Sequence, residues 1–278
     1  MFRPVPRIDL VTAGDAFEDF VFADLPRLPR AGEELKTTAF ARSSGGGPII
    51  TAVAAARLGL RCRVIAAVGP GSAQRLAREG VGVVNVRKRG EPLAITTAIS
   101  TRTDRAFVTF PGVNDRIEHR IMRAVRRVSA RHVHFALQPA RCSRWVPAVR
   151  ALRRRGVTTS WDFGWSDRLA RDRGLRQLAA AVDILFLNAA ERRLYRGLGA
   201  DTTIVKLGAK GARIETRGTR RAESIPAARV RAIETTGAGD VFNGAFLAAF
   251  LGGRSLRECA RAGNRAAARS TRGPGGLA

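Results

Sequence analysis

The chain is poor in lysine, cysteine and aromatic residues, and each scarcity narrows what the protein can be. Lysines account for only four of the 49 basic residues, and aromatic residues make up 6% of the chain. A surface for single-stranded nucleic acid interleaves aromatic with basic side chains, so this composition argues against that function. The three cysteines lack CxxC spacing, which argues against a cysteine metal or redox motif and predicts buried free thiols.

Long apolar runs are also absent. No stretch of 18 apolar residues occurs, so the sequence predicts no membrane-spanning helix. Residues 1–7 include arginines, but they are not followed by the apolar segment of a secretory signal. We therefore expect a cytoplasmic protein without a membrane partner.

Positive charge is the most unusual feature of the composition. The formal net charge is +26. A field of this sign attracts nucleic acid and anionic small molecules. The arginines are scattered, however, and form only short clusters such as 153–155. The sequence therefore predicts no more than non-specific binding of nucleic acid.

Strand-like and helix-like segments alternate along most of the chain. This alternation is typical of an α/β fold with a doubly wound, mostly parallel sheet flanked by helices. The expected strands cover 5–13, 63–68, 132–136, 157–161, 184–187 and 203–206, with short ones at 214–216 and 223–225. The expected helices cover 49–58, 72–79, 117–129, 143–155, 175–181, 189–198, 240–251 and 256–270.

A second, smaller β structure is predicted in the N-terminal half of the chain. The prediction rests on four β-like segments, at 20–22, 37–40, 93–101 and 105–110, and the last two are interpreted as a hairpin. We assign a β lid to about 17–41 and 91–112, and we treat 1–278 as a single domain. The Ser/Gly/Pro cluster at 43–48 is interpreted as a break that opens the next helix.

The most informative motif lies near the C-terminus, where Thr-Thr-Gly-Ala-Gly-Asp at 235–240 leads into an apolar helical pattern. Free backbone N–H groups at a helix start form an anion site. A carboxylate beside an anion site is better suited to proton abstraction than to anion binding. Aspartate also caps ordinary helices, but the Gly-Ala-Gly approach costs more chain entropy than a cap requires. A P-loop of the form GxxxxGK[ST] is absent. We therefore interpret this motif as the phosphoryl-transfer site.

The motif at 235–240 resembles the signature of the ribokinase-like, or PfkB, carbohydrate kinase family. Further similarities follow in the family's order from about residue 8 to residue 275. They are Gly14 with Asp19, Gly45-Gly46 with the helix at 52–59, the hairpin end at 107–114, Asn188-x-x-Glu191, Lys206 to Gly211, and Asn264.

The resemblance implies an ATP-dependent kinase that phosphorylates a hydroxyl group of a sugar, nucleoside or related small molecule. Asp240 would be the base that takes the hydroxyl proton. The backbone N–H groups from Thr236 to Asp240, which include those of Gly237, Ala238 and Gly239, would stabilise the transferring phosphoryl group.

The resemblance also assigns the cofactors ATP and Mg²⁺. Asn188 and Glu191 would hold the Mg²⁺, through water, although an N-cap with an acid at the third helical position is the ordinary alternative for this pair. The remaining nucleotide contacts would be Lys206, Gly208, Gly211, Thr236 and Asn264.

Asp19, Gly45 and Gly46 would face the acceptor, and here the chain departs from the family pattern. Ile50 stands where the family usually has an asparagine that contacts the sugar, and the usual Gly-Asp-Asp segment is missing. Glu234 replaces an aspartate near a monovalent-cation site that some members have. A second hypothesis is therefore a nucleotide-binding relative that has lost or changed catalysis and acts as a regulator.

Two smaller expectations complete the interpretation. Family members often pair through the lid, so a homodimer is plausible. His132 and His134 alternate on one expected strand, where core positions are favoured over a metal pair because no third ligand is evident.

Overall fold

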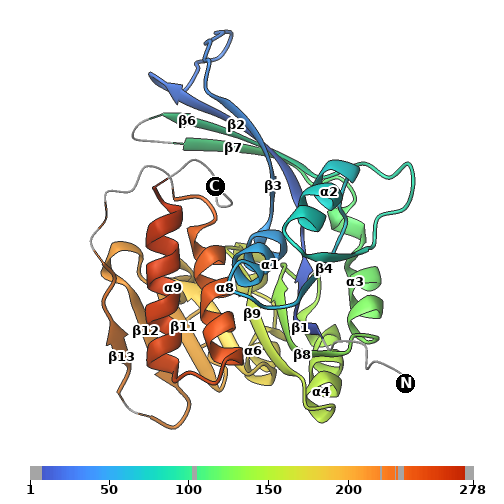
Figure 1. The fold of residues 1–278 in the computed structure, drawn as a ribbon, viewed down its shortest axis with the longest axis vertical. Coiled ribbons are helices and arrows are strands. Elements are labelled where there is room, and N and C mark those ends of the chain that lie inside the picture. Colours follow the sequence, from blue (N-terminus) through green and yellow to red (C-terminus); the bar gives the residue numbers. More distant parts are fainter. Residues whose placement is uncertain (1–7, 102–104, 220, 229, 231–234, 273–278) are drawn as a thin grey trace.

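The computed structural model describes residues 8–101, 105–219, 221–228, 230 and 235–272. Within these ranges, nine strands form one large sheet in the order β13-β12-β11-β10-β9-β8-β1-β4-β5 (Figure 1). The strands from β11 to β5 in this order run parallel, and β12 and β13 add an antiparallel edge. Their bounds are β1 Ile8–Gly14, β4 Cys62–Ala66, β5 Gly82–Asn85, β8 Ala130–Ala136, β9 Thr158–Asp162, β10 Ile184–Asn188, β11 Thr202–Lys206, β12 Ala212–Thr216 and β13 Glu223–Ile225.

A second sheet begins directly beyond the carboxyl end of β1 and projects from that end of the large sheet (Figure 1). Its described strands pair in the order β3-β2-β6-β7, with β2 and β6 parallel and the outer pairs antiparallel. Their bounds are β2 Phe17–Leu25, β3 Phe40–Gly45, β6 Ile95–Thr101 and β7 Arg105–Phe110. The predicted α/β fold with a smaller β structure is confirmed, whereas the role of that structure as a lid stays a prediction.

Helices cover both faces of the large sheet, as the doubly wound interpretation requires. One apolar core lies under α3, α4 and α6, and the other under α1, α2, α8 and α9. The helices are α1 Gly47–Ala56, α2 Pro70–Arg78, α3 Glu118–Val125, α4 Val146–Arg154, α5 Asp167–Ala170, α6 Leu175–Ala181, α7 Ala189–Leu194, α8 Ala238–Leu251 and α9 Leu256–Ser270.

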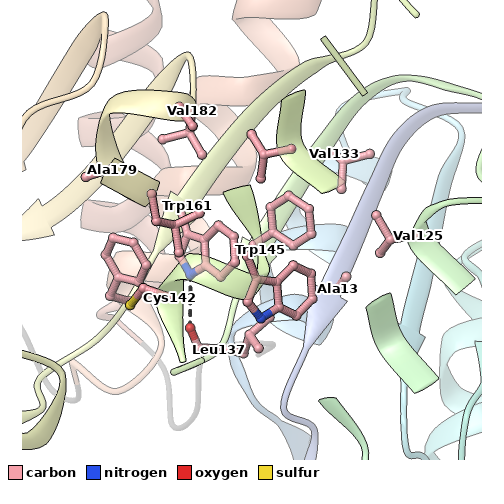
Figure 2. Close-up of a cluster of buried hydrophobic side chains, with 14 of the residues drawn as sticks. Ala13, Val125, Val133, Leu137, Cys142, Trp145, Trp161, Ala179 and Val182 are labelled. Carbon is pink, nitrogen blue, oxygen red and sulfur yellow. Dashed lines mark hydrogen bonds between the residues drawn. The ribbon is translucent and has the colours of Figure 1, made fainter. Parts of the chain in front are cut away.

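Aromatic side chains give the first of these cores its rigidity (Figure 2). Trp161 of β9 stacks on Phe135 with ring centroids 4.5 Å apart, and it meets Trp145 edge-on at 5.2 Å. All three rings are fully buried. The indole of Trp161 donates a hydrogen bond to the carbonyl oxygen of Leu137 at 3.0 Å, so burying its N–H leaves no donor unpaired. This packing fixes the ends of β8 and β9, which carry site residues.

The main correction to the expected elements concerns β3. The sequence suggested a strand at 37–40 and a break at 43–48, but the strand is Phe40–Gly45. Pairing with β2 overrides the local Ser/Gly propensity, because Gly45 lies opposite Phe17 and Ser44 lies opposite Glu18. The edge strand β5 and the short helix α5 were not expected, and α7 ends at Leu194 rather than at residue 198.

The paired histidines are core residues, as expected. His132 and His134 are fully buried, and their rings lie within 2.8 Å of the hydroxyl oxygen of Ser160. Burial lowers the pKa of His132 to about 3 and that of His134 to about 4, so both rings are neutral. The described residues contain no cluster of three metal-ligating side chains, and none of their helices is long and apolar enough to cross a membrane.

Candidate active site

The N-terminus of α8 lies between two cavities, both at the carboxyl ends of the parallel strands, where open α/β sheets bind ligands. Asp240 lines the larger cavity, of about 750 Å³, which we call the Asp240 cavity. Ala238 and Gly239 line a cavity of about 430 Å³, which we call the Asn264 cavity. Gly237 makes this arrangement possible, because its φ of 74° is a left-handed conformation that favours glycine.

Asp240 is a carboxylate with no partner. Its side chain has neither a hydrogen bond nor an ion pair anywhere in the described chain, while its carbonyl accepts a hydrogen bond from Thr51 at 3.2 Å. Gly47 leaves room for it, since a Cβ there would lie 3.1 Å from Asp240 Oδ1. Burial, followed by repulsion from Asp162, raises the pKa of Asp240 to about 7. A carboxyl group with this pKa can both accept and release a proton near neutral pH.

The turn before α8 also leaves backbone donors available. The N–H groups of Ala238 and Asp240 already bond within the turn, to Thr235 O at 3.2 Å and Gly237 O at 3.0 Å. The N–H groups of Gly237 and Gly239 have no acceptor within the ranges that the structure covers. Unpaired N–H groups at a helix start attract an anion.

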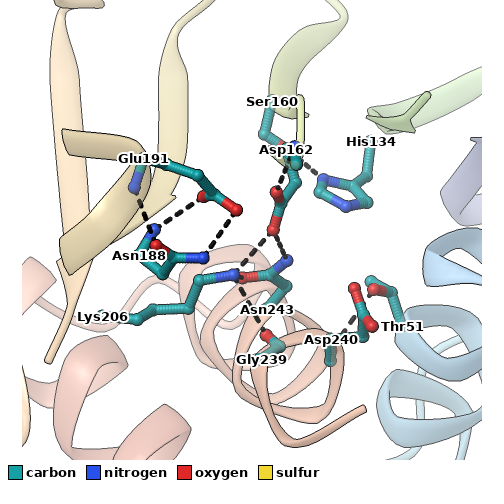
Figure 3. A network of polar contacts seen from close by, with 11 residues as sticks. Thr51, His134, Ser160, Asp162, Asn188, Glu191, Lys206, Gly239, Asp240 and Asn243 are labelled. Carbon is teal, nitrogen blue, oxygen red and sulfur yellow. Dashed lines mark hydrogen bonds and ion pairs between the residues drawn. The ribbon is translucent and has the colours of Figure 1, made fainter. Parts of the chain in front are cut away.

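Lys206 forms an ion pair with Asp162 in a network of polar contacts (Figure 3). Its ammonium nitrogen lies 2.6 Å from Asp162 Oδ2 and 3.5 Å from the carbonyl oxygen of Gly239. Asn243 completes the cluster by donating to Asp162 Oδ2 at 2.8 Å. Burial opposes both charges, but their mutual attraction outweighs it, so the pKa of Lys206 is raised and the pKa of Asp162 is lowered. Asp162 lines the Asp240 cavity and Lys206 lines the Asn264 cavity, so this ion pair joins them.

Asn188 and Glu191 form a complete capping box at the start of α7 (Figure 3). Asn188 Oδ1 accepts from the Glu191 N–H at 2.8 Å, and Glu191 Oε2 accepts from the Asn188 N–H at 2.8 Å. The ordinary helix-start alternative is therefore realised in the geometry. Burial, followed by repulsion from Asp162, nevertheless raises the pKa of Glu191 to about 7. A cation nearby would relieve that repulsion.

The Asn264 cavity brings together most of the residues predicted to bind a nucleotide. Five predicted residues line it: Asn188, Lys206, Gly208, Gly211 and Asn264. Thr236 was also predicted, but its neighbour Thr235 lines the cavity instead. The amide of Asn264 donates to Ile225 O at 3.1 Å and to Pro226 O at 3.3 Å, which fixes the loop after β13. Most of the other lining residues are small and apolar, among them Ala227, Ala228, Val230, Ala267 and Ala268, and the lining also includes Phe242 and Thr271.

The predicted acceptor residues lie apart from the cavity lining. Asp19 is placed against Gly45, where a Cβ would come within 1.8 Å of its carboxylate, and Ile50 is buried in α1 with 6% exposure. The Asp240 cavity is instead lined by residues that sequence reasoning missed, among them Asp15, Phe17, Gly47, Asn114, Gln138 and Arg168. Asp15 could have been found, because it directly follows the carboxyl end of β1. Glu234, which carried the monovalent-cation prediction, lies outside the described residues.

This architecture is that of a ribokinase-like kinase, and comparison with known proteins bears this out. A solved structure of Arabidopsis thaliana ribokinase complexed with ribose and ATP superposes with a TM-score of 0.77 at 24% identity, covering 98% of this chain and 95% of that one. Ribokinase of Haemophilus influenzae is 25% identical over 288 residues, 94% of this chain and 92% of that protein. An ATP-dependent ribose-1-phosphate kinase of Halopiger xanaduensis is 30% identical over 241 residues, 81% of this chain and 79% of that protein.

The sequence model of the pfkB family carbohydrate kinases matches residues 7–277. The chain therefore belongs to that family and is an enzyme of the kinase class.

Proposed function

We propose that the protein transfers the γ-phosphoryl group of ATP to a hydroxyl group of a sugar, a nucleoside or a related small molecule. The observation that carries this proposal is the position of Asp240, a half-buried carboxylate without a partner that faces a 750 Å³ cavity from the start of α8. A nucleotide seated in the Asn264 cavity would meet the other side of the same turn. The γ-phosphoryl group and the acceptor hydroxyl would then approach each other at the N-terminus of α8.

Each group at the turn has a role in the proposed transfer. The Asp240 carboxylate accepts the proton of the acceptor hydroxyl, whose oxygen then attacks the γ-phosphorus. The unpaired N–H groups of Gly237 and Gly239 donate to the phosphoryl oxygens. Lys206 adds a positive charge close to Gly239, which favours the negative transition state. Asn264 and the glycines of the β11–β12 turn shape the seat of the nucleotide.

Asn188 and Glu191 are the residues that would hold Mg²⁺. The donor set fits, because Asn188 and Glu191 bring an amide oxygen and a carboxylate together at the start of α7, and Mg²⁺ takes oxygen ligands. Magnesium keeps several waters and binds through one or two carboxylates with substrate phosphates, which suits contact through water from an intact capping box. Bound there, the ion would neutralise phosphate charge during transfer.

A homodimer through the small sheet is part of the same proposal. Phe22 pairs with Phe40 across β2 and β3, so both project from one face, whereas Thr109 of the opposite face lines the Asp240 cavity. On the face turned away from the site, Phe22, Phe40, Val108 and Phe110 are 38%, 54%, 67% and 54% exposed. A second copy of the sheet would cover this apolar surface.

The test is release of ADP by the purified chain with ATP, Mg²⁺ and a panel of sugars, nucleosides and amino sugars. We expect at least one acceptor to give turnover of about 1 s⁻¹ or more, within the ordinary enzyme range. Binding of ATP without turnover of any panel member would contradict the proposal. It would favour the alternative of a catalytically altered family member with a regulatory role.

A further inference from the structure

The Asp240 cavity is acidic although the protein is strongly basic. Five carboxylates line it, those of Asp15, Asp115, Glu118, Asp162 and Asp240, against the single guanidinium of Arg168. The Asp162 charge is balanced by Lys206. The formal charge of +26 therefore does not describe this cavity, which would repel an anionic acceptor.

The amides and the guanidinium around the cavity each donate to at least one acceptor within the protein. The amide of Asn114 donates to Ala16 O at 3.0 Å, and the amide of Gln138 donates to Trp165 O at 2.8 Å. Arg168 donates to Ala140 O at 3.1 Å and to Pro139 O at 2.9 Å. The carboxylate of Glu118 is also occupied, by the Trp145 indole and the Ala140 N–H.

Three carboxylates remain without hydrogen bond or ion pair in the part of the chain with assigned structure, namely Asp15, Asp115 and Asp240. Apart from Asp240, these are Asp15 and Asp115. The side chain of Asp15 is less exposed to solvent than that of Asp115. The Asp15 N–H bonds to Ala136 O at 3.2 Å, and its carbonyl lies against Gly46, where a Cβ would meet it at 2.2 Å. These contacts fix the Asp15 backbone at the wall of the Asp240 cavity.

Burial, followed by repulsion from Asp115 and Glu118, raises the pKa of Asp15 to about 7. An unpaired carboxylate in this surrounding gains from a ligand that supplies both positive charge and hydrogen-bond donors. An ammonium group carries one positive charge and donors only. A hydroxyl group supplies one donor without charge.

Building on the proposed function, we propose that the Asp240 cavity takes an acceptor that carries a protonated amine beside its hydroxyl groups, and that Asp15 binds the amine. The phosphorylated hydroxyl lies at Asp240, and the ammonium group lies toward Asp15, Asp115 and Glu118. Asp15 is thus a specificity-determining residue, separate from the base.

Matched acceptors test this directly. D-glucosamine is compared with D-glucose, D-galactosamine with D-galactose, and 1-amino-1-deoxy-D-fructose with D-fructose, in the assay of ADP release. We expect kcat/KM to favour at least one amine over its neutral partner by about tenfold or more, the scale of a hydrogen bond to a charged group. The Asp15→Asn variant keeps the shape and should lose that preference. The readout is the ratio of the two kcat/KM values, which should fall toward one whatever the change in the absolute rates.

Asp24→Asn is the control, since Asp24 is exposed on β2, lies away from the cavity lining and gives the same change in net charge. If neutral acceptors are preferred and Asp15→Asn slows both partners equally, the inference is wrong while the kinase function stands. If no acceptor is phosphorylated, the proposed function fails instead. The inference is then decided by thermal shift with the same amines: a shift that Asp15→Asn abolishes supports it, and no amine-specific shift overturns it.

Discussion

The two cavities on either side of α8 differ in how they are built. The Asn264 cavity has small apolar walls and a few polar groups, and most of its residues come from continuous motifs in the last third of the chain. The Asp240 cavity is lined by carboxylates and assembled from the ends of β1, β7, β8 and β9 and the segments that follow them. A fixed nucleotide can be recognised by one recurring set of turns, whereas a variable acceptor is recognised by side chains gathered from separate loops.

The difference has a physical basis in the backbone. On the nucleotide side, Gly211 adopts a φ of 94°, and a Cβ there would approach Ile225 O to 2.1 Å. Such a position requires glycine and therefore leaves a signal in the sequence. In the Asp240 cavity, Asp15 follows β1, and its side chain makes no hydrogen bond or ion pair within the described residues. Its role follows only from what surrounds it.

The largest effect is expected from Asp240→Asn, which removes the base but keeps the shape. Turnover should fall by about 10²-fold or more, the scale of general-base catalysis. Binding of ATP should change little, because the Asp240 side chain lies outside the Asn264 cavity lining. Turnover is measured by ADP release and ATP binding by calorimetry. Equal losses of turnover and of ATP binding would contradict the proposal that the two cavities bind different substrates.

Lys206→Met should affect both cavities together. The substitution leaves the carboxylate of Asp162 buried without its cation, which costs about 3–5 kcal/mol in the free energy of unfolding. Urea denaturation measures this loss. Adding Asp162→Asn to the variant should recover much of the stability, since the unpaired charge is removed. An unchanged unfolding free energy for Lys206→Met would show that the ion pair does not hold the two sides together.

Gly211→Ala and Gly208→Ala form a matched pair on the nucleotide side. Both positions have positive φ, so each alanine should cost about 1–2 kcal/mol in unfolding free energy. Gly211→Ala should cost about 1–3 kcal/mol more, because its Cβ meets Ile225 O whereas the Gly208 Cβ meets open space. The KM for ATP should rise for both variants, because both glycines line the Asn264 cavity, with the acceptor KM unchanged. Thermal denaturation would separate the two variants, and equal losses of stability would contradict the steric argument.

The pH dependence should be the mildest of these effects. Asp240 must be ionised to accept a proton, and burial raises its pKa to about 7. The value of kcat/KM for a neutral acceptor should therefore fall up to about tenfold per pH unit below about 7 and level off above it. The sign for stability is opposite. Protonated Asp240 suits its buried position, so its contribution to stability is full below the ordinary aspartate pKa and is lost as pH rises through about 7. If the residual kcat/KM of Asp240→Asn still falls below about pH 7, the group that titrates is not Asp240.

Sequence reasoning therefore predicted the fold, and it named more of the residues that line the Asn264 cavity than of those that line the Asp240 cavity. The alternation of strands and helices predicted the doubly wound sheet, and β13 and α9 begin and end where the pattern placed them. The pattern failed at β3, where pairing with β2 overrides the Ser/Gly propensity. It also failed to find Lys206–Asp162–Asn243 as a cluster, because these residues meet only through the packing of three elements. The assigned roles of Asp19, Gly45, Gly46 and Ile50 stay predictions.

The start of α8 also fixes the distance between the two cavities along the helix. Gly239 borders one cavity and Asp240 borders the other, so consecutive residues of a single helix line the two cavities. At a rise of about 1.5 Å per residue, this step amounts to about 1.5 Å along the helix axis. Helices change length far less readily than loops change shape. If the proposed transfer takes place across this turn, the gap that the phosphoryl group crosses would stay the same from one substrate to the next.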